Sequence, residues 1–244
     1  MENTITFFHG EGGFAPFGMQ HIGAVLAFLV LGIVVIGVAK YRLNPKQQYW
    51  LGNAIAFFIA GSVILWTIFK IVLGTFTTAD FPIALCNFSA LVIPMMMYYK
   101  SYELFEVLYF WVLAGTMQAN FTPDLHFGFP HFCFFKYWIV HSGLIVAICY
   151  AIFVYNWRPY LRSMFKSYLA LWAYFFFTIF INFLTGDNHM YLNHKPVTAS
   201  LLDYMGPWPY YVGVVILLII PFFFVVYLPF LIKDAIFRFA RRNL

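Results

Sequence analysis

The feature that most limits what this chain can fold into is a series of seven predominantly apolar stretches. Each is close to the roughly 20 residues that a helix needs to cross the hydrocarbon core of a bilayer. They cover residues 19–39, 50–72, 81–99, 103–120, 134–156, 166–186 and 210–232. Of the 244 residues, 63% are hydrophobic and only 9% are charged, which excludes a soluble fold. Because backbone groups in lipid must bond within the chain, we expect one all-α domain, residues 1–244, forming a polytopic bundle of seven transmembrane helices.

The positive charges predict how this bundle is oriented. Eleven Lys and Arg residues fall in the loops after the first, third and fifth stretches and in the C-terminal tail: Lys40, Arg42, Lys46, Lys100, Arg158, Arg162, Lys166, Lys233, Arg238, Arg241 and Arg242. The opposite side holds only Lys136 and Lys195, while Lys70 lies inside the end of the second stretch. Because cytoplasmic loops are enriched in Lys and Arg, we expect the N-terminus outside and the C-terminus in the cytoplasm. The net charge of +5 therefore indicates membrane topology rather than nucleic-acid binding.

Two reactive side chains fall at a similar depth below the expected outer surface. Cys86 follows Asp80 by six residues and His141 follows Lys136 by five. At ~1.5 Å per residue, the two lie about 9 Å and about 7–8 Å below the outer ends of their spans. A histidine can remove the proton of a thiol, and the thiolate can then attack a carbonyl carbon. Cys86 and His141 are therefore candidate catalytic residues, although the sequence leaves open whether their spans touch, and a cysteine in a membrane helix is more often a space filler.

Further polar side chains are candidate substrate-binding groups: His21, Asn87, Gln118 and Asn182 within the spans, and Asp124 and Asp203 in the outer loops. Asn87 or Gln118 could hydrogen-bond an oxyanion, and the two aspartates could position a headgroup. The alternatives are hydrogen bonds between helices and solvated loop carboxylates. A zinc site formed by His21, Cys86 and His141 is conceivable, but no pair has the short spacing of a local metal motif. We therefore expect neither a metal nor a cofactor.

Three groups of segments carry a resemblance to a known family. They are Gly115-Thr-Met-Gln-Ala-Asn-Phe-Thr-Pro-Asp-Leu125 with Phe129-Pro-His131 and His141; Lys195-Pro196 with Ser200-Leu-Leu-Asp203 and Gly206-Pro-Trp-Pro-Tyr210; and Phe81-Pro-Ile-Ala-Leu-Cys86 with Phe17 to His21. Together they resemble the YwaF-like family of bacterial integral membrane proteins over essentially the whole chain. The resemblance implies a multi-pass protein of the bacterial plasma membrane.

A more distant resemblance concerns function. The chain is similar to the eukaryotic transmembrane protein 164 group, described as cysteine-dependent acyltransferases that act on ether phospholipids. The pair proposed there is a cysteine in one span and a histidine farther along, and Cys86 and His141, 55 residues apart, match that arrangement. The resemblance implies lipid acyl transfer by this pair. Ala84 departs from the pattern, because many YwaF-like sequences carry a polar residue shortly before the cysteine.

The sequence thus favours a membrane-embedded lipid acyltransferase or hydrolase, with membrane lipids as partners and an outward-facing polar pocket. Two alternatives stay open. A small-molecule transporter or receptor could use the same pocket, although the chain shows no obvious inverted repeat and no charged relay at the membrane centre. A non-enzymatic envelope protein is the other alternative, although no sequence feature marks a partner face.

Overall fold

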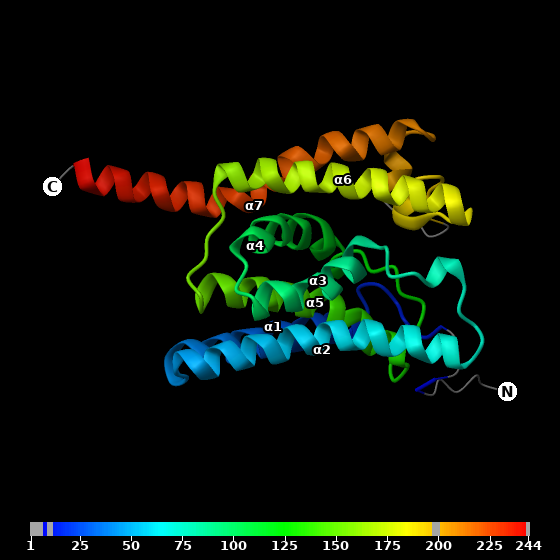
Figure 1. Ribbon diagram of the computed structural model, residues 1–244, viewed down its shortest axis with the longest axis horizontal. Helices are drawn as coiled ribbons and strands as arrows, with labels where there is room; N and C mark the ends of the chain where they lie inside the picture. Colours follow the sequence, from blue (N-terminus) through cyan, green and yellow to red (C-terminus); the bar gives the residue numbers. More distant parts are fainter. Residues whose placement is uncertain (1–6, 9–11, 197–200, 243–244) are drawn as a thin grey trace.

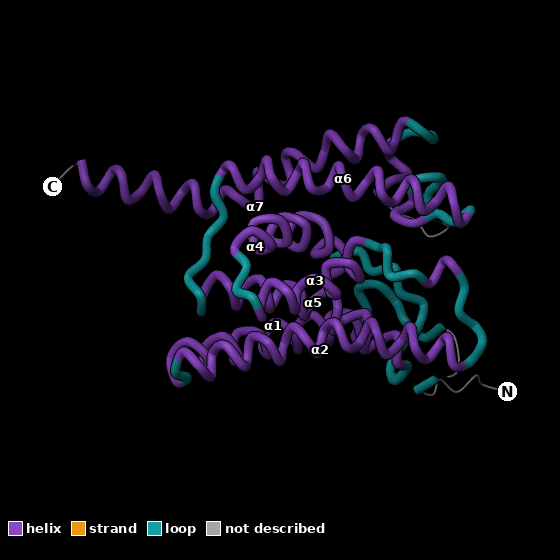
Figure 2. The backbone as a smooth tube through the Cα atoms, in the orientation of Figure 1, coloured by secondary structure: helices purple, strands orange, loops and turns teal. Residues whose placement is uncertain are grey.

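The computed structural model describes residues 7–8, 12–196 and 201–242, and this part of the chain is helical (Figures 1 and 2). Its α-helices are α1 (Met19–Arg42), α2 (Pro45–Val72), α3 (Leu85–Tyr98), α4 (Tyr102–Phe110), α5 (Phe132–Phe153), α6 (Leu161–Thr185) and α7 (Tyr210–Arg242). Short 3₁₀ turns stand in the connections, and no named strand occurs among the described residues. The all-helical fold predicted from the sequence is confirmed for this part of the chain.

Five of the seven helices are long and apolar enough to cross a membrane: α1, α2, α5, α6 and α7. The third predicted span begins later than expected, because α3 has only 14 residues and starts at Leu85 rather than near Phe81. Pro82 explains the delay, since a proline has no N–H and disfavours a helical residue before it. Cys86 therefore lies in the first turn of α3, not deep within a longer helix as the sequence predicts.

The fourth predicted span is helical throughout but changes type along its length. After α4 the chain continues as a wide π-helical turn, η2 (Trp111–Gly115), and then as a 3₁₀ segment, η3 (Thr116–Asn120). The indole Nε1 of Trp111 donates to the carbonyl oxygen of Ser167 on α6 over 3.2 Å, which anchors the wide turn to its neighbour. Such π turns are often found at functional sites.

Local sequence signals explain where the long helices begin and end. The side chain of Asn44 accepts a hydrogen bond from the Gln47 amide over 3.0 Å, and the Gln47 side chain accepts one from the Asn44 amide over 3.1 Å. This reciprocal cap, with Pro45 at the first helical position, starts α2. Helix α6 ends at Gly186, whose φ of 76° is a left-handed conformation that favours glycine.

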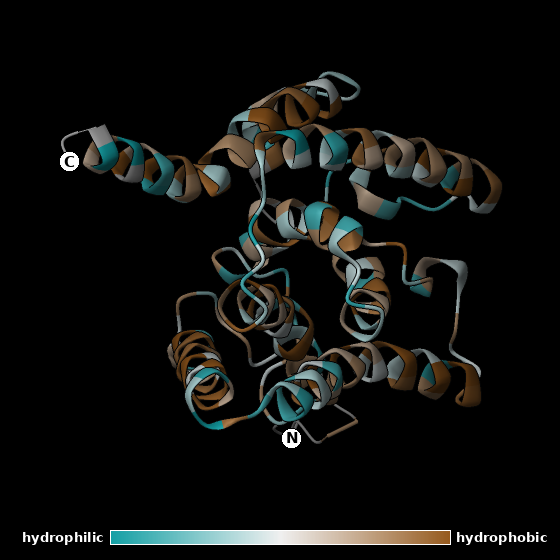
Figure 3. Ribbon diagram, turned by 60° about the vertical axis from the view of Figure 1, so that its left-hand side comes forward, coloured by the Kyte–Doolittle hydropathy of each residue, from teal (hydrophilic) through white to brown (hydrophobic). Residues whose placement is uncertain are grey.

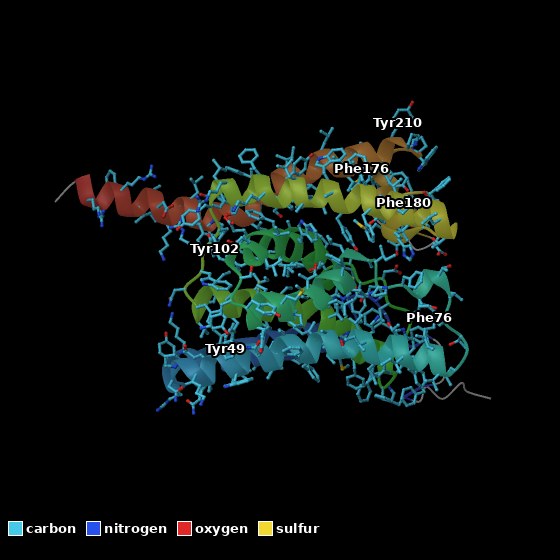
Figure 4. All side chains as sticks on the ribbon, viewed as in Figure 1. Tyr49, Phe76, Tyr102, Phe176, Phe180 and Tyr210 are labelled. Atoms are coloured by element: carbon cyan, nitrogen blue, oxygen red, sulfur yellow. The ribbon has the colours of Figure 1, made fainter. Side chains whose placement is uncertain are left out.

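Helix α5 is the centre of the bundle. It contacts α1, α2 and α3, whereas α6 contacts α4 and α7 on the other side of the molecule (Figure 1). Half of the residues in the apolar stretch of α5 are buried, against 11% in the corresponding stretches of α1 and α7. The peripheral helices therefore present their apolar residues to the surroundings (Figure 3). Phe176 and Phe180 on α6 show this outward orientation (Figure 4). The fold buries a core around α5 and leaves an apolar outer surface for lipid.

Successive helices run in opposite directions, so their connections gather at two ends of the bundle (Figure 1). Tyr49 and Tyr102 lie at the end where α7 finishes, and Phe76 and Tyr210 lie at the end where α1 begins (Figure 4). Aromatic side chains favour the two membrane–water boundaries. We call these the α7-terminal end and the α1-initial end.

A buried carboxylate joins α4 to α6 near the α7-terminal end. The side chain of Glu106 is only 1% exposed, and its oxygens accept hydrogen bonds from Lys166 Nζ over 2.5 Å and Ser163 Oγ over 2.5 Å. Close by, Arg158 donates two hydrogen bonds to Asp234 over 2.8 and 2.7 Å, which ties the connection between α5 and α6 to α7. These contacts join α4 to α6, and they join the connection between α5 and α6 to α7.

Replacing Glu106 tests the importance of this link. We expect Glu106→Ala to lower the free energy of unfolding by about 3 kcal/mol, because Ser163 and Lys166 lose a buried partner. Glu103→Ala is the matched control, since Glu103 lies on the same helix, is exposed and should change stability by less than about 0.5 kcal/mol. Thermal or denaturant unfolding in detergent measures both. Equal stabilities for the two variants would contradict a structural role for Glu106.

Candidate functional site

The thiol of Cys86 lies at the N-terminus of α3, at the α1-initial end of the bundle. Ala84 caps the helix, and the first intrahelical bond runs from the Phe88 amide to the Ala84 carbonyl over 2.9 Å. The amides of the first turn therefore have no carbonyl partner within the helix. The positive end of the helix stabilises negative charge at this position.

A second contact holds the turn before Cys86 in place. Tyr174 on α6 donates its hydroxyl to the carbonyl oxygen of Ile83 over 2.6 Å. The ring of Tyr174 also packs on Phe88, with the ring centroids 4.5 Å apart. The start of α3 is thus fixed by a helix from the other side of the bundle.

The ring of His141 lies on the buried face of α5 and has a defined orientation. Its Nδ1 lies 2.8 Å from the carbonyl oxygen of Tyr137. Because a carbonyl only accepts hydrogen bonds, this contact places the proton on Nδ1 and leaves Nε2 with its lone pair. The ring of Tyr137 packs on the imidazole at a centroid distance of 4.2 Å, and the Tyr137 hydroxyl donates to the Ala119 carbonyl over 2.9 Å.

Cys86 and His141 come together where α3 packs against α5. The two helices are in contact, and the Cys86 thiol and the His141 imidazole lie within electrostatic range of each other. With Nδ1 bonded to the backbone, Nε2 is the nitrogen available to take a proton from sulfur. The arrangement contains a nucleophile, a base and a backbone group that orients the base, which are the elements needed for thiol-based acyl transfer.

His21 and Asn120 form a second polar group that borders α1 and α5. His21 Nδ1 accepts from the Phe17 amide over 2.9 Å, so its Nε2 donates to the Asn120 carbonyl, also over 2.9 Å. The Asn120 side-chain oxygen accepts from Ser142 Oγ over 2.6 Å. Both ring nitrogens of His21 are occupied, which leaves it no lone pair for a metal shared with Cys86 and His141.

Three other substrate-binding candidates make hydrogen bonds to groups other than Cys86 and His141. The amide of Asn182 makes two hydrogen bonds to the backbone of His189, over 3.0 and 2.8 Å, and so fixes the loop after α6. Asp124 accepts from the Tyr191 hydroxyl over 2.9 Å, and Asp203 accepts through its carbonyl from Lys195 over 3.5 Å. Burial first, and then the nearby Asp124 carboxylate, raise the pKa of Tyr191 to about 12, so it stays a donor. These residues organise connections at the α1-initial end of the bundle.

Two apolar cavities flank η3. One, of about 330 Å³, lies among η2, α6 and α7, and its lining includes Leu85, Gln118, Trp172 and Phe222. The other, of about 740 Å³, is a groove along α1 and α5. It runs from His21 and Asn120 at one end to Lys40 and Tyr41 at the other, and Ser142, the neighbour of His141, lines it. Leu85, next to Cys86, thus lines one cavity, and Ser142, next to His141, lines the other.

Sequence reasoning missed four residues within electrostatic range of the Cys86 sulfur: Lys136, Tyr137, Tyr174 and Tyr191. Tyr137 precedes His141 by four residues, so the spacing that places two residues on one helix face could have identified it. Tyr174 and Tyr191 come from distant parts of the chain, and no local pattern connects them to Cys86.

Comparison with protein families gives one match. The model of the TMEM164 family aligns with residues 16–227, which include all seven helices except the end of α7. Comparison with curated proteins and with solved structures gives no match. The aligned range contains Cys86 and His141 together with both cavities' linings. The chain therefore belongs to the TMEM164 family of membrane proteins.

Proposed function

We propose that this protein is a lipid acyltransferase embedded in the membrane, with Cys86 as nucleophile and His141 as base. The observation that carries the proposal is that α3, which begins with Cys86, packs against α5, where the Tyr137 carbonyl fixes the tautomer of the His141 imidazole within electrostatic range of the thiol. The adjacent cavity of about 330 Å³ is apolar and begins at Leu85, next to Cys86, which suits an acyl chain. Membership of the TMEM164 family and the apolar outer surface support a substrate drawn from the bilayer.

The first half-reaction forms a thioester. His141 Nε2 takes the thiol proton, and the Cys86 thiolate attacks the carbonyl carbon of a lipid ester to give a tetrahedral oxyanion. The amides of the first turn of α3, including that of Asn87, are candidates to donate to this oxyanion, and Gln118 lines the same cavity as Leu85. When the intermediate collapses, the ester C–O bond breaks and the imidazolium returns its proton to the departing alkoxide.

The second half-reaction transfers the acyl group. His141 takes the proton of an acceptor hydroxyl, whose oxygen attacks the thioester; the C–S bond breaks and the thiolate regains a proton from the imidazolium. Water as acceptor gives hydrolysis, whereas a lysolipid hydroxyl gives transfer. Burial within a helical bundle limits access of bulk water and favours the lipid acceptor. The groove along α1 and α5 provides a second apolar surface on the His141 side.

We further propose that the protein lies in a bacterial plasma membrane with the α1-initial end outward, as the YwaF-like motifs and the distribution of charge suggest. The α7-terminal end carries the connections with Lys46, Lys100 and Arg158, and basic residues favour the cytoplasmic side. Cys86 and His141 would then act near the outer leaflet.

Cys86→Ala should abolish acyl exchange between phospholipids in proteoliposomes, and His141→Asn should reduce it at least about 100-fold, because the base is lost. Cys133→Ala is the matched control, since Cys133 is also a free cysteine but lines neither cavity. Lipid mass spectrometry follows the exchange, and peptide mass spectrometry detects an acyl group on Cys86. Exchange at the wild-type rate in Cys86→Ala would refute the proposal.

Reporter fusions test the orientation. A green fluorescent protein fused after residue 242 should fluoresce, because it folds in the cytoplasm, whereas alkaline phosphatase fused there should be inactive. Alkaline phosphatase inserted in the connection between α6 and α7 should be active. The reversed pattern of activities would contradict the proposed orientation.

A further inference from the structure

Lys136 is a charged residue beside the Cys86–His141 contact that the reaction above does not use. It lies near the start of α5, is half-buried and is within electrostatic range of Cys86, Cys133, Asp80 and Lys70. Across residues 7–8, 12–196 and 201–242, no carboxylate lies within salt-bridge distance of its ammonium group. A charged group in this position without a partner is costly, and in membrane proteins it usually marks a functional site.

The neighbouring carboxylate, Asp80, is paired with Lys70 and lies outside salt-bridge distance of Lys136. Asp80 accepts from Lys70 Nζ over 2.5 Å, from the Thr77 amide over 2.9 Å and from the Thr77 hydroxyl over 3.1 Å. Burial alone would raise the pKa of the Asp80 carboxyl, but the Lys70 and Thr77 contacts outweigh it and hold the pKa below its usual range. Asp80 is therefore ionised and paired at neutral pH.

The local charge leaves room for one anion. Lys70 and Lys136 contribute two positive charges and Asp80 one negative charge, so an excess of one positive charge remains beside the Cys86 thiol. The excess is carried by an ammonium with three unused donors. A phosphodiester carries one negative charge, which balances the excess positive charge, and its exposed oxygens can accept hydrogen bonds from the ammonium group.

The position of Lys136 also matches the covalent layout of a glycerophospholipid. It precedes His141 by five residues on α5, which is about 7–8 Å nearer the α1-initial end of the helix. In a glycerophospholipid the phosphate lies on the headgroup side of the ester carbonyls, only a few bonds away. A lipid whose ester carbonyl is at Cys86 and whose chain enters the cavity next to Leu85 would direct its phosphate toward this end.

We propose that Lys136 binds the headgroup phosphate of the lipid whose ester reacts at Cys86, and so makes the site selective for glycerophospholipids over neutral glycerolipids. The inference rests on the proposed function for its catalytic consequence, but the binding step can be measured by itself. Lys136 acts as a specificity-determining residue, and Lys70 with Asp80 forms the neutral ion pair beside it.

The test measures lipid binding in a Cys86→Ala background, where no turnover occurs. Phosphatidylcholine and a diacylglycerol with the same chains are titrated into the detergent-solubilised protein and bound lipid is counted by native mass spectrometry. Lys136→Met should weaken phosphatidylcholine binding about tenfold, whereas Lys136→Arg should retain it and diacylglycerol binding should not change. Lys46→Met is the matched control, because Lys46 is an exposed lysine at the opposite end of the bundle.

Three results would overturn the assignment: unchanged phosphatidylcholine binding in Lys136→Met, an equal loss for both lipids, or the same loss in Lys46→Met. A third ligand, inorganic phosphate, distinguishes a headgroup from free phosphate. It should fail to displace phosphatidylcholine at millimolar concentration, and tight Lys136-dependent binding of inorganic phosphate alone would also refute the lipid assignment.

Acyl transfer by the protein with Cys86 intact separates this inference from the proposed function. Lys136→Met should raise KM for phosphatidylcholine about tenfold and leave kcat within about twofold, and it should leave the KM for a phosphate-free thioester donor unchanged. Lys136-dependent phospholipid binding without any acyl transfer in the wild type would refute the acyltransferase and support the headgroup site. Transfer with unaltered KM and binding in Lys136→Met would refute the headgroup site alone.

Discussion

The structure depends on one constraint: a backbone in lipid must satisfy its own hydrogen bonds. Regular helices meet this requirement along most of the chain, and irregular backbone is confined to places where other groups supply the partners. At the start of α3, the Tyr174 hydroxyl bonds the Ile83 carbonyl, and near η3 the Tyr137 hydroxyl bonds the Ala119 carbonyl. The irregular segments therefore lie against protein, and they are also where reactive side chains accumulate.

The same contacts account for the geometry around the thiol. The tyrosine that supports the start of α3 comes from α6, and the one that supports η3 comes from α5, one turn before His141. Cys86 and His141 are thus held by a framework that spans both sides of the bundle. The buried Glu106 near the other end performs a comparable task with a carboxylate and a lysine, joining α4 to α6 without any neighbouring thiol or histidine.

Hydropathy and charge were sufficient to predict the helical fold and the approximate ranges of the helices, because apolar length is a local property of the sequence. The late start of α3 was not predicted, although Pro82 was visible, since the hydropathy of residues 81–84 does not differ from that of a span. The pairing of Cys86 with His141 was predicted from their similar depth and from a family resemblance, and its dependence on how α3 packs against α5 lies beyond any local pattern. The sequence identifies Lys136 and Glu106 only as charged residues, because the hydrogen-bond partners available to each depend on the folded chain.

The wide turn η2 has a consequence for the two amides that follow it. A π turn inserts one residue relative to a regular α-helix, and one residue corresponds to a rotation of about 100° around the helix axis. This phase shift sets the directions of Gln118, which lines the cavity among η2, α6 and α7, and Asn120, which lines the groove along α1 and α5. A single-residue deletion between Trp111 and Gly115 would restore the regular period and turn both amides away from their present cavities. The number of residues in this short segment, more than its composition, therefore decides which cavity each amide lines.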